Sequence, residues 1–355
     1  MRVGILTSGG DCQALNATMR GLALTLYRNV KDVEIIGFID GYKGLMYEKY
    51  KKMKPKDFYD ILNVGGSILG NSRCPFKRMR IIENGFDKVK AMKNTYKKLE
   101  LDCLVVLGGN GSIKSANMLS QEGLNVIALP KTIDNDAWGT DYTFGYSSAT
   151  AIATRYLDEI KTTAASHSRV FVIEVMGHKV GHICLSAGIA AGADVILLPE
   201  IPYDIKVVAK KVKETLKNEK NYAIIACAEG AISEADALMK RKDYKAKVLA
   251  RNGRSVAYEV ADELSQEIDA EIRVSCIGHA QRGGNPNCYD REISTRFGVE
   301  GARLIIKKHY GEYVVLQGNH VTHIPLEATA GKLKYVDTEG EIVQSAKLVG
   351  ISFGE

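Results

Sequence analysis

The sequence lacks the features that mark membrane proteins, disulfide-stabilised proteins and nucleic-acid-binding proteins. No apolar run reaches the roughly 18 residues that a membrane-spanning helix needs. The 7 cysteines form no CxxC pair and lie at no metal-binding spacing from a histidine, so we expect reduced thiols. No stretch combines a dense basic stripe with interleaved aromatic residues. These absences predict a cytoplasmic protein with no membrane and no nucleic acid among its partners.

The composition is that of an ordinary globular protein. The chain has 355 residues, 45% of them hydrophobic and 25% charged, which is enough to divide a core between two domains. The 48 Lys and Arg residues exceed the 42 Asp and Glu residues, and the formal charge is +6. A modest positive excess suits anionic small molecules as ligands.

Short apolar runs alternate with helical patterns along the chain. Runs that are apolar on both faces are typical of parallel strands covered by helices on each side, so we expect an α/β fold. The predicted strands are residues 3–6, 34–39, 103–107, 126–129, 170–174, 195–198, 222–226 and 271–276, and the predicted helices are residues 16–27, 113–122, 148–163, 204–217, 254–268 and 294–308.

Two glycine-rich loops follow predicted strands. GILTSGGD, residues 4–11, runs from a strand into the Gly9-Gly10 turn, and VVLGGNGS, residues 105–112, repeats the arrangement. Paired glycines let backbone N–H groups approach an anion, and a following helix N-terminus adds a favourable dipole. Such glycines also merely tighten strand–helix turns in many α/β proteins. The second loop lacks both the GK[ST] ending and the GxGxxG spacing, so a nucleotide there would be held by a different geometry.

A third loop, PKTIDNDAWGTDYTFG at residues 130–145, carries the most specific chemistry. Asp134 and Asp136 follow a predicted buried strand beside Lys131 and Thr132, and Asp141 lies close in sequence. Carboxylates there can accept a hydroxyl proton or hold Mg²⁺, and a lysine can neutralise a transferring phosphoryl group. Loop aspartates are often only solvated or capping groups. The neighbouring lysine and the two phosphate-type loops favour the catalytic interpretation.

A fourth group of polar residues is spread over the second half of the chain. Arg169, Arg273 and Arg282 lie near strand ends, together with Glu229 and His279. Arginines offer bidentate donors to phosphate oxygens, so this set suits a phosphate monoester. A structural ion-pair network is the alternative interpretation of the same residues.

These residues resemble the phosphofructokinase family from residue 1 to about residue 335. The motifs SGGDCQALNATMRG, GGSILGNSR, LGGNGS, PKTIDND, GTDYTFG, VMGH, IGHAQRGGNP and YDR stand in family order and spacing. The resemblance implies two doubly wound (Rossmann-like) parallel-sheet domains with the active site in the cleft between them. It also implies a phosphoryl-donor domain at residues 1–142 plus about 283–335, a sugar-phosphate domain at 143–282 and a C-terminal extension at 336–355. A homodimer or homotetramer is expected.

The resemblance also implies a role for individual residues in moving a phosphoryl group onto the 1-hydroxyl of fructose 6-phosphate. Asp134 is expected to be the base, Asp136 to support the sugar and Mg²⁺, and Lys131, Thr132 and Arg73 to act on the transferring group. The expected donor ligands are Gly10, Arg73, Cys74, Gly109, Asn110, Gly111 and Ser112. The expected sugar-phosphate ligands are Thr132, Ile133, Asp134, Arg169, Met176, Gly177, His178, Glu229, Arg273, His279 and Arg282, with Arg169 and Arg273 reaching the phosphate from a neighbouring subunit.

The chain departs from the family pattern in four places. Asn110 stands where an Asp linked to the metal is usual, so Asn110 is a weak metal-ligand candidate; His178 replaces an arginine, and CQAL replaces a Pro-Gly or similar pair. Lys131 stands where the bacterial ATP enzymes keep Gly, while Gly111 stands where pyrophosphate enzymes usually carry Asp. Because an Asp at 111 would repel an α-phosphate, Gly111 favours ATP as donor. Pyrophosphate is the alternative donor, and a weakly catalytic sugar-phosphate-binding regulator is the alternative of another class.

Overall fold

The computed structural model describes residues 1–218, 220–329 and 331–355. The chain splits into two compact units, Met1–Ser148 with Arg282–Lys334, and Ala149–Gln281 with Tyr335–Glu355. The first boundary falls at residue 148 rather than 142, and the residues expected as a C-terminal extension belong to the second unit. This division reflects compactness alone, so the donor and sugar-phosphate roles of the two units stay predictions.

The first unit is built on a seven-stranded sheet with the order β11-β10-β5-β4-β1-β2-β3. Its five inner strands are parallel, and each edge strand, β3 or β11, runs antiparallel to its neighbour. The parallel strands are buried on both faces, which is why they read as continuous apolar runs. The strands are β1 (Arg2–Ser8), β2 (Glu34–Phe38), β3 (Tyr50–Met53), β4 (Cys103–Gly108), β5 (Val126–Pro130), β10 (Glu312–Gln317) and β11 (His320–Pro325).

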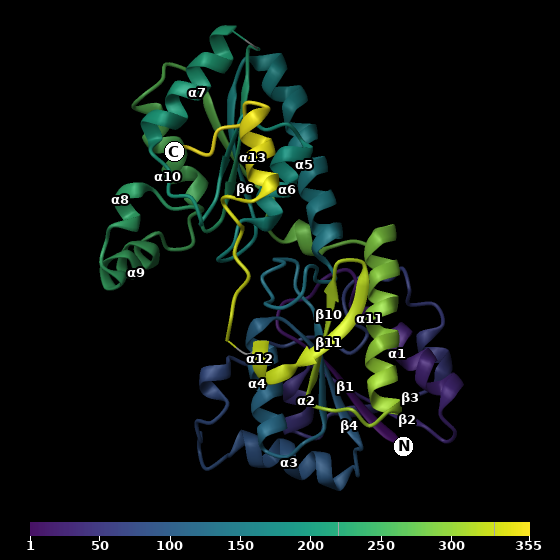
Figure 1. The fold of residues 1–355 in the computed structure, drawn as a ribbon. Coiled ribbons are helices and arrows are strands. Elements are labelled where there is room, and N and C mark those ends of the chain that lie inside the picture. Colours follow the sequence, from purple (N-terminus) through teal and green to yellow (C-terminus); the bar gives the residue numbers. More distant parts are fainter. Residues whose placement is uncertain (219, 330) are drawn as a thin grey trace. The chain divides into compact units, whose positions relative to one another are not determined.

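Helices cover both faces of this sheet (Figure 1). On one face α2 (Tyr42–Met46), α3 (Lys88–Lys98) and α4 (Asn110–Gln121) bury apolar side chains against the strands. On the other face α1 (Leu15–Asn29) and α11 (Cys288–Ile306) run side by side. They approach so closely that a Cβ added at Gly298 would lie 2.3 Å from the Thr18 carbonyl oxygen. Short helical segments, η1 (Pro55–Phe58), η2 (Phe76–Arg78) and α12 (Leu326–Thr329), complete the unit.

The second unit has a four-stranded parallel sheet with the order β7-β8-β6-β9. Apolar side chains of α7 and α10 pack on one face of it, and α5, α6 and α13 lie on the other (Figure 1). The strands are β6 (Val170–Val175), β7 (Val195–Leu197), β8 (Ala223–Ala228) and β9 (Ile272–Cys276). The helices are α5 (Tyr146–His167, whose first turn belongs to the first unit), α6 (His182–Ala190), α7 (Ile205–Asn218), α8 (Glu234–Ala237), α9 (Arg241–Ala250), α10 (Val256–Ser265), η3 (Gly278–Arg282) and α13 (Glu341–Leu348).

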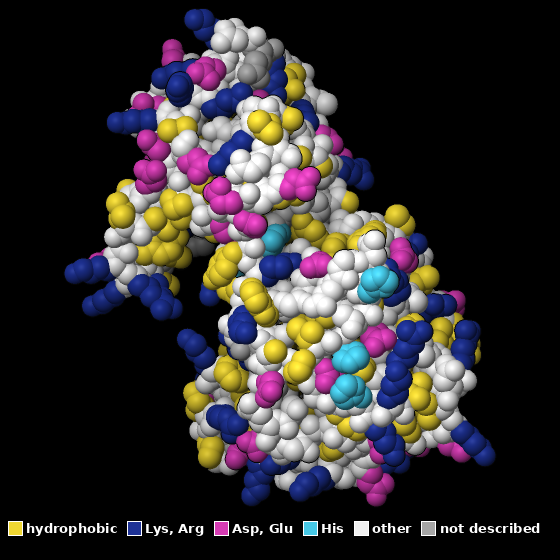
Figure 2. Space-filling view, viewed as in Figure 1, with side chains coloured by type: hydrophobic (Ala, Val, Ile, Leu, Met, Phe, Trp, Pro, Cys, Tyr) yellow, Lys and Arg dark blue, Asp and Glu magenta, His cyan; other side chains and the backbone are white. Residues whose placement is uncertain are grey.

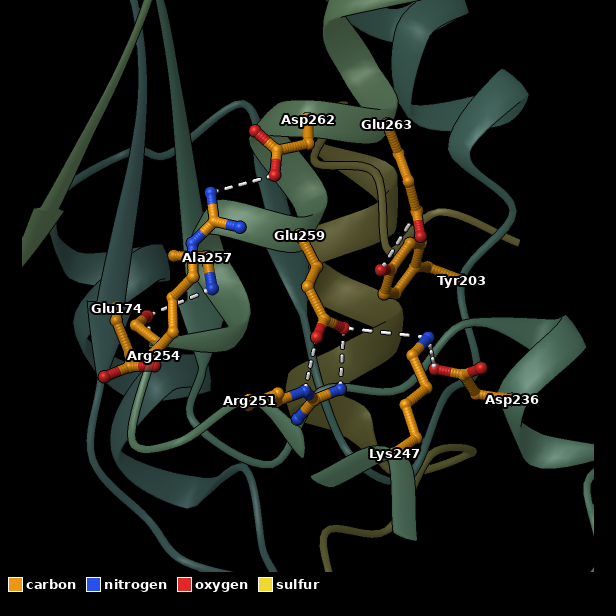
Figure 3. Close-up of polar contacts among 11 residues, drawn as sticks. Glu174, Tyr203, Asp236, Lys247, Arg251, Arg254, Ala257, Glu259, Asp262 and Glu263 are labelled. Atoms are coloured by element: carbon orange, nitrogen blue, oxygen red, sulfur yellow. Dashed lines mark hydrogen bonds and ion pairs between the residues drawn. The ribbon is translucent and has the colours of Figure 1, made fainter. Parts of the chain in front are cut away.

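Ion pairs attach the α8–α9 segment to α10 (Figure 3). The Arg251 guanidinium donates to both carboxylate oxygens of Glu259 on α10, at 2.5 and 2.7 Å, and the Lys247 Nζ lies 3.7 Å from a Glu259 oxygen. Lys247 also donates to Asp236 at 2.6 Å, which connects α9 to α8. The outer surface of the segment is a mixture of basic and apolar side chains (Figure 2), with Leu238 88% exposed and Leu249 80% exposed. Polar contacts rather than a shared apolar core therefore hold this segment.

The predicted α/β class and parallel sheets are confirmed, and every predicted strand and helix overlaps an observed one. Three strands were missed. Residues 50–53 have no apolar pattern that would predict a strand, because three of the four are exposed lysine or tyrosine, and β11 is similarly polar. β10 is a buried apolar strand that the sequence interpretation overlooked. All seven cysteines are free thiols, as predicted. Within the described residues, no helix combines the length and apolar character that a membrane crossing requires.

Candidate active site

The turn after β1 is shaped by two glycines. Gly9 has φ +90°, a left-handed conformation that glycine adopts without strain, and its N–H donates to the Ser72 carbonyl oxygen at 3.1 Å. A Cβ at Gly10 would lie 2.7 Å from Nη1 of Arg282, the same atom that donates to the Asp11 carbonyl oxygen at 2.8 Å. A guanidinium group thus lies directly against the turn at Gly10.

The turn after β4 leads into the N-terminus of α4. Gly109 is the N-cap residue, and a Cβ at Gly108 would lie 2.3 Å from the Ser112 Cβ, so the chain passes too closely for a larger residue. A Cβ at Gly111, by contrast, would meet nothing within 4 Å. The free N–H groups and positive dipole end of a helix favour an anion at such a turn. The space at Gly111 leaves room for one.

Lys131, the first residue after β5, joins the two glycine turns. Its side chain is buried, with the residue 3% exposed, and its Nζ donates to the Gly10 carbonyl oxygen at 2.5 Å. Its backbone N–H donates to the Gly108 carbonyl oxygen at 3.2 Å. Burial lowers the pKa of Lys131, while the carboxylates of Asp134 and Asp136 act in the opposite direction. A cation is thus held at the point where both turns meet.

The aspartate loop that follows is held by hydrogen bonds to its own backbone. The Thr132 hydroxyl accepts a bond from the Asp134 N–H at 3.1 Å. Asn135 has φ +54°, and its side-chain oxygen accepts from the Thr143 N–H at 3.1 Å. These bonds leave Asp134 only half-buried, whereas Asp136 is 8% exposed. The loop therefore presents one accessible carboxylate beside a buried one.

The carboxyl ends of β1, β4 and β5 lie next to one another, since Ser8 pairs with Gly108 and Gly108 with Pro130. Ligands of open α/β sheets bind at such ends. Two anion-accepting turns, a buried ammonium group and an accessible carboxylate fit the transfer of a phosphoryl group to a hydroxyl, because that reaction needs charge neutralisation and a proton acceptor.

Asp290, in the YDR motif, is a residue whose role the sequence interpretation missed. It is fully buried on α11 and accepts hydrogen bonds from the N–H groups of Gly145 at 3.0 Å and Ser148 at 2.8 Å, and from the Ser148 hydroxyl at 2.5 Å. Burial raises the pKa of Asp290 even so. The carboxylate fixes the chain that leaves the aspartate loop. The YDR motif was recognisable in the sequence. It lies so far along the chain from the aspartate loop that nothing in the sequence indicated a contact between them.

The VMGH loop of the second unit is held by Glu229. Gly177 has φ +157° and His178 has φ +54°, and a Cβ at Gly177 would lie 2.4 Å from the Val180 carbonyl oxygen. One Glu229 carboxylate oxygen accepts from the N–H groups of Gly177 at 3.2 Å and His178 at 2.5 Å. Glu229, predicted as a sugar ligand, therefore also shapes the loop that carries two other predicted ligands. The His178 side chain is exposed.

Arg169 and Arg273 come together on one carboxylate. Arg169 Nε lies 2.8 Å from a Glu271 oxygen, and Arg273 pairs with the other oxygen of the same residue. Within this chain the two arginines share one acidic partner, Glu271, which was not among the residues of the predicted set. Arg273 lies on the edge strand β9 and remains exposed.

The predicted site residues divide between the two units. The second unit carries Arg169, Met176, Gly177, His178, Glu229, Arg273 and His279, the last of them exposed in η3. The first unit carries the remaining predicted residues, including Arg73, which is exposed, Cys74, which is half-buried, and Arg282. Ile133 is fully buried, so only its backbone can contact a substrate.

No three His, Cys, Asp or Glu side chains within residues 1–218, 220–329 and 331–355 are placed to hold a metal ion. Mg²⁺ is commonly bound by one or two carboxylates plus substrate phosphates, so this arrangement is compatible with a Mg²⁺–nucleotide complex. The side-chain amide of Asn110, the weak candidate, donates to the Lys332 carbonyl oxygen at 2.5 Å.

A sequence model of the family described as phosphofructokinase matches residues 2–305. The chain belongs to the phosphofructokinase family. It is 46% identical to the ATP-dependent 6-phosphofructokinase of Spirochaeta thermophila, over 99% of this chain and 97% of that one. It is 42% identical to ATP-dependent 6-phosphofructokinase 3 of Bacteroides thetaiotaomicron over 100% of both chains. The structure of phosphofructokinase from Saccharomyces cerevisiae matches with a TM-score of 0.80 at 28% identity, covering 92% of this chain and 45% of the yeast chain.

Replacing Asp134 with Asn should lower kcat by about 10² to 10⁴, because the amide cannot accept the hydroxyl proton. Binding of fructose 6-phosphate, followed by calorimetry, should change little. Asp141→Asn is the matched control in the same loop, since its side-chain oxygen can still accept from the Gly318 N–H. A variant at position 134 that keeps more than half of the wild-type kcat would remove Asp134 from the role of base.

Proposed function

We propose that the protein transfers the γ-phosphoryl group of ATP to the 1-hydroxyl of fructose 6-phosphate, giving fructose 1,6-bisphosphate, as a cytoplasmic enzyme of glycolysis. One observation carries the proposal: Lys131, the residue before the aspartate loop, contacts both glycine turns. Its Nζ lies 2.5 Å from the Gly10 carbonyl oxygen. Relatives that align with the whole chain and are named ATP-dependent 6-phosphofructokinases support the choice of substrates.

The residues of the first unit would perform the chemical step. Asp134 takes the proton of the sugar hydroxyl, and Thr132 orients the reacting oxygens. Lys131 and Arg73 stabilise the charge that spreads over the transferring phosphoryl oxygens. Mg²⁺, held by the donor phosphates and the Asp136 carboxylate, would add to this neutralisation.

The residues of the second unit would hold the sugar phosphate. Met176, Gly177, His178 and Glu229 are proposed to contact the sugar, and His279 its 6-phosphate. Arg282 keeps its predicted role as a ligand of the sugar phosphate. The loop geometry favours this assignment because the N–H groups of residues 177 and 178 donate to Glu229, which fixes their backbone before any ligand arrives. A purely regulatory, non-catalytic role is less favoured, since Asp134, Asp136, Arg73 and Thr132 are all retained.

The choice of ATP over pyrophosphate can be tested at Gly111. The wild-type protein, in a coupled assay with fructose 6-phosphate, should use ATP and make little use of pyrophosphate. Because a Cβ at Gly111 meets nothing within 4 Å, Gly111→Asp should be tolerated by the fold. The new carboxylate should repel the α-phosphate and lower kcat/KM for ATP by about 10² or more, with less harm to any pyrophosphate activity.

Gly111→Ala is the matched control, because it adds the Cβ without the charge and should keep most of the ATP activity. Efficient use of pyrophosphate by the wild-type protein, with ATP almost inactive, would refute the donor assignment. The CQAL sequence, residues 12–15, would then be the place to look for what rejects the nucleotide.

We also propose that the active enzyme is a homodimer or homotetramer in which Arg169 and Arg273 reach the sugar phosphate of a neighbouring subunit. Arg273 is exposed on an edge strand, and Glu271 positions both arginines. This arrangement favours contact between the two arginines and a neighbouring subunit. Bidentate donors of this kind suit a phosphate monoester.

Mixing two inactive variants tests the shared site. Arg169→Ala and Asp134→Ala should each be inactive, yet subunit exchange between them should restore up to about a quarter of the activity per site, because some hybrid sites combine an intact arginine with an intact base. Light scattering of the mixture confirms the assembly. Absence of recovery after proven exchange would show that Arg169 acts within its own chain.

A further inference from the structure

Residues 331–334, which follow α12 near α4 (Figure 1), lie along the aspartate loop. Leu333 forms an antiparallel bridge with Ala137, and the Lys334 N–H donates to the Asp136 carbonyl oxygen at 2.9 Å. This pairing ties the backbone on the C-terminal side of Asp134 and Asp136 to a segment almost two hundred positions later in the chain. The pairing lies wholly within the first unit.

The Lys334 side chain makes a second connection to the same loop. Its Nζ donates to the carbonyl oxygens of Thr140 and Asp141, both at 2.9 Å. Burial lowers the pKa of Lys334 to about 8, while the charges of Asp141 and Asp136 oppose this shift. Hydrogen bonds from a charged donor to carbonyl groups are among the stronger ones in proteins. Lys334 therefore binds both ends of the loop segment 136–141.

Asn110 anchors the segment from the other side. Its amide Nδ2 donates to the Lys332 carbonyl oxygen at 2.5 Å, at the first turn of α4. The Lys332 ammonium lies 5.6 Å from the centre of the Trp138 ring, a cation–π distance. An Asp at position 110 could not donate this bond, because its carboxylate would face a carbonyl oxygen. The contact gives a physical reason for Asn110 where the family pattern has Asp.

We infer that residues 331–334, with Lys334 and Asn110 as positioning residues, form a clasp that holds the aspartate loop against the start of α4. In this arrangement Asn110 acts as a hydrogen-bond donor to the clasp and not as a replacement metal ligand. The inference rests on the proposed function for its effect on catalysis, but its structural part concerns the protein without substrates.

The only tryptophan of the chain makes the clasp directly observable. Trp138 lies within the clasped loop and is 47% exposed. Loosening the loop should increase the quenching of its fluorescence by acrylamide, by at most about twofold because nearly half of the side chain is already exposed. This measurement needs no substrate, so it remains valid even if the proposed reaction is wrong.

The experiment compares Lys334→Met, Lys334→Arg and Asn110→Asp with the wild type, and uses Lys97→Met, an exposed lysine on α3, as control. Lys334→Met and Asn110→Asp should raise the quenching of Trp138 and lower kcat about tenfold, with KM for ATP within about threefold of wild type. Lys334→Arg keeps the positive charge and the hydrogen-bond donors. Its Trp138 quenching and its kcat should therefore stay close to the wild-type values. Lys97→Met should match the wild type in both.

Wild-type quenching in both Lys334→Met and Asn110→Asp would overturn the clasp. So would a gain of activity in Asn110→Asp with unchanged quenching, since that result would make position 110 a metal-ligand position. If Lys334→Met does not fold, Asn110→Asp carries the test alone. If the quenching changes as expected but no variant or wild-type protein phosphorylates fructose 6-phosphate, the clasp stands and the proposed function fails.

Discussion

A buried ammonium group connects the parts of the first unit that carry its chemistry. Taking a lysine out of water costs several kcal/mol unless its charge and its hydrogen bonds are satisfied. Lys131 meets this requirement through the Gly10 carbonyl oxygen and the nearby carboxylates of Asp134 and Asp136. The hydrogen bond to Gly10 has two effects. It stabilises the buried lysine, and it fixes the turn after β1 relative to the loop after β5. At Gly108, close approach of the chain to Ser112 accounts for the glycine.

Each unit organises its own part of the proposed chemistry with local backbone contacts. In the first unit the Thr132 hydroxyl and the Asn135 side chain hold the aspartate loop, and Asp290 holds the chain that leaves it. In the second, Glu229 holds the turn at Gly177 and His178. Such bonds pre-arrange binding groups, so that less conformational entropy is lost when a ligand arrives.

The sequence predicted those features that depend on neighbours along the chain. Buried strands, amphipathic helices and the loops that follow strands are all local patterns, and Lys131, Thr132 and Asp134 were recognisable because they follow a strand directly. Contacts between distant segments were not predictable in this way. Asn110 bonds a carbonyl group 222 residues away, and Asp290 reaches Ser148 across 142 residues. The shared partner of Arg169 and Arg273, Glu271, could not be chosen from spacing, because several acidic residues lie nearby in the sequence.

The central claim, that the buried Lys131 charge serves phosphoryl transfer rather than folding, is tested most directly by Lys131→Met, with kcat and the free energy of unfolding measured on the same protein. Methionine has a similar length but leaves the Gly10 carbonyl oxygen without its donor, so the free energy of unfolding should fall by about 1 to 3 kcal/mol while the protein stays folded. The account predicts that kcat nevertheless falls by about 10³ or more, because the transferring group loses a preorganised cation. A variant that keeps its kcat within tenfold of wild type, or one that loses activity only because it unfolds, would contradict the account.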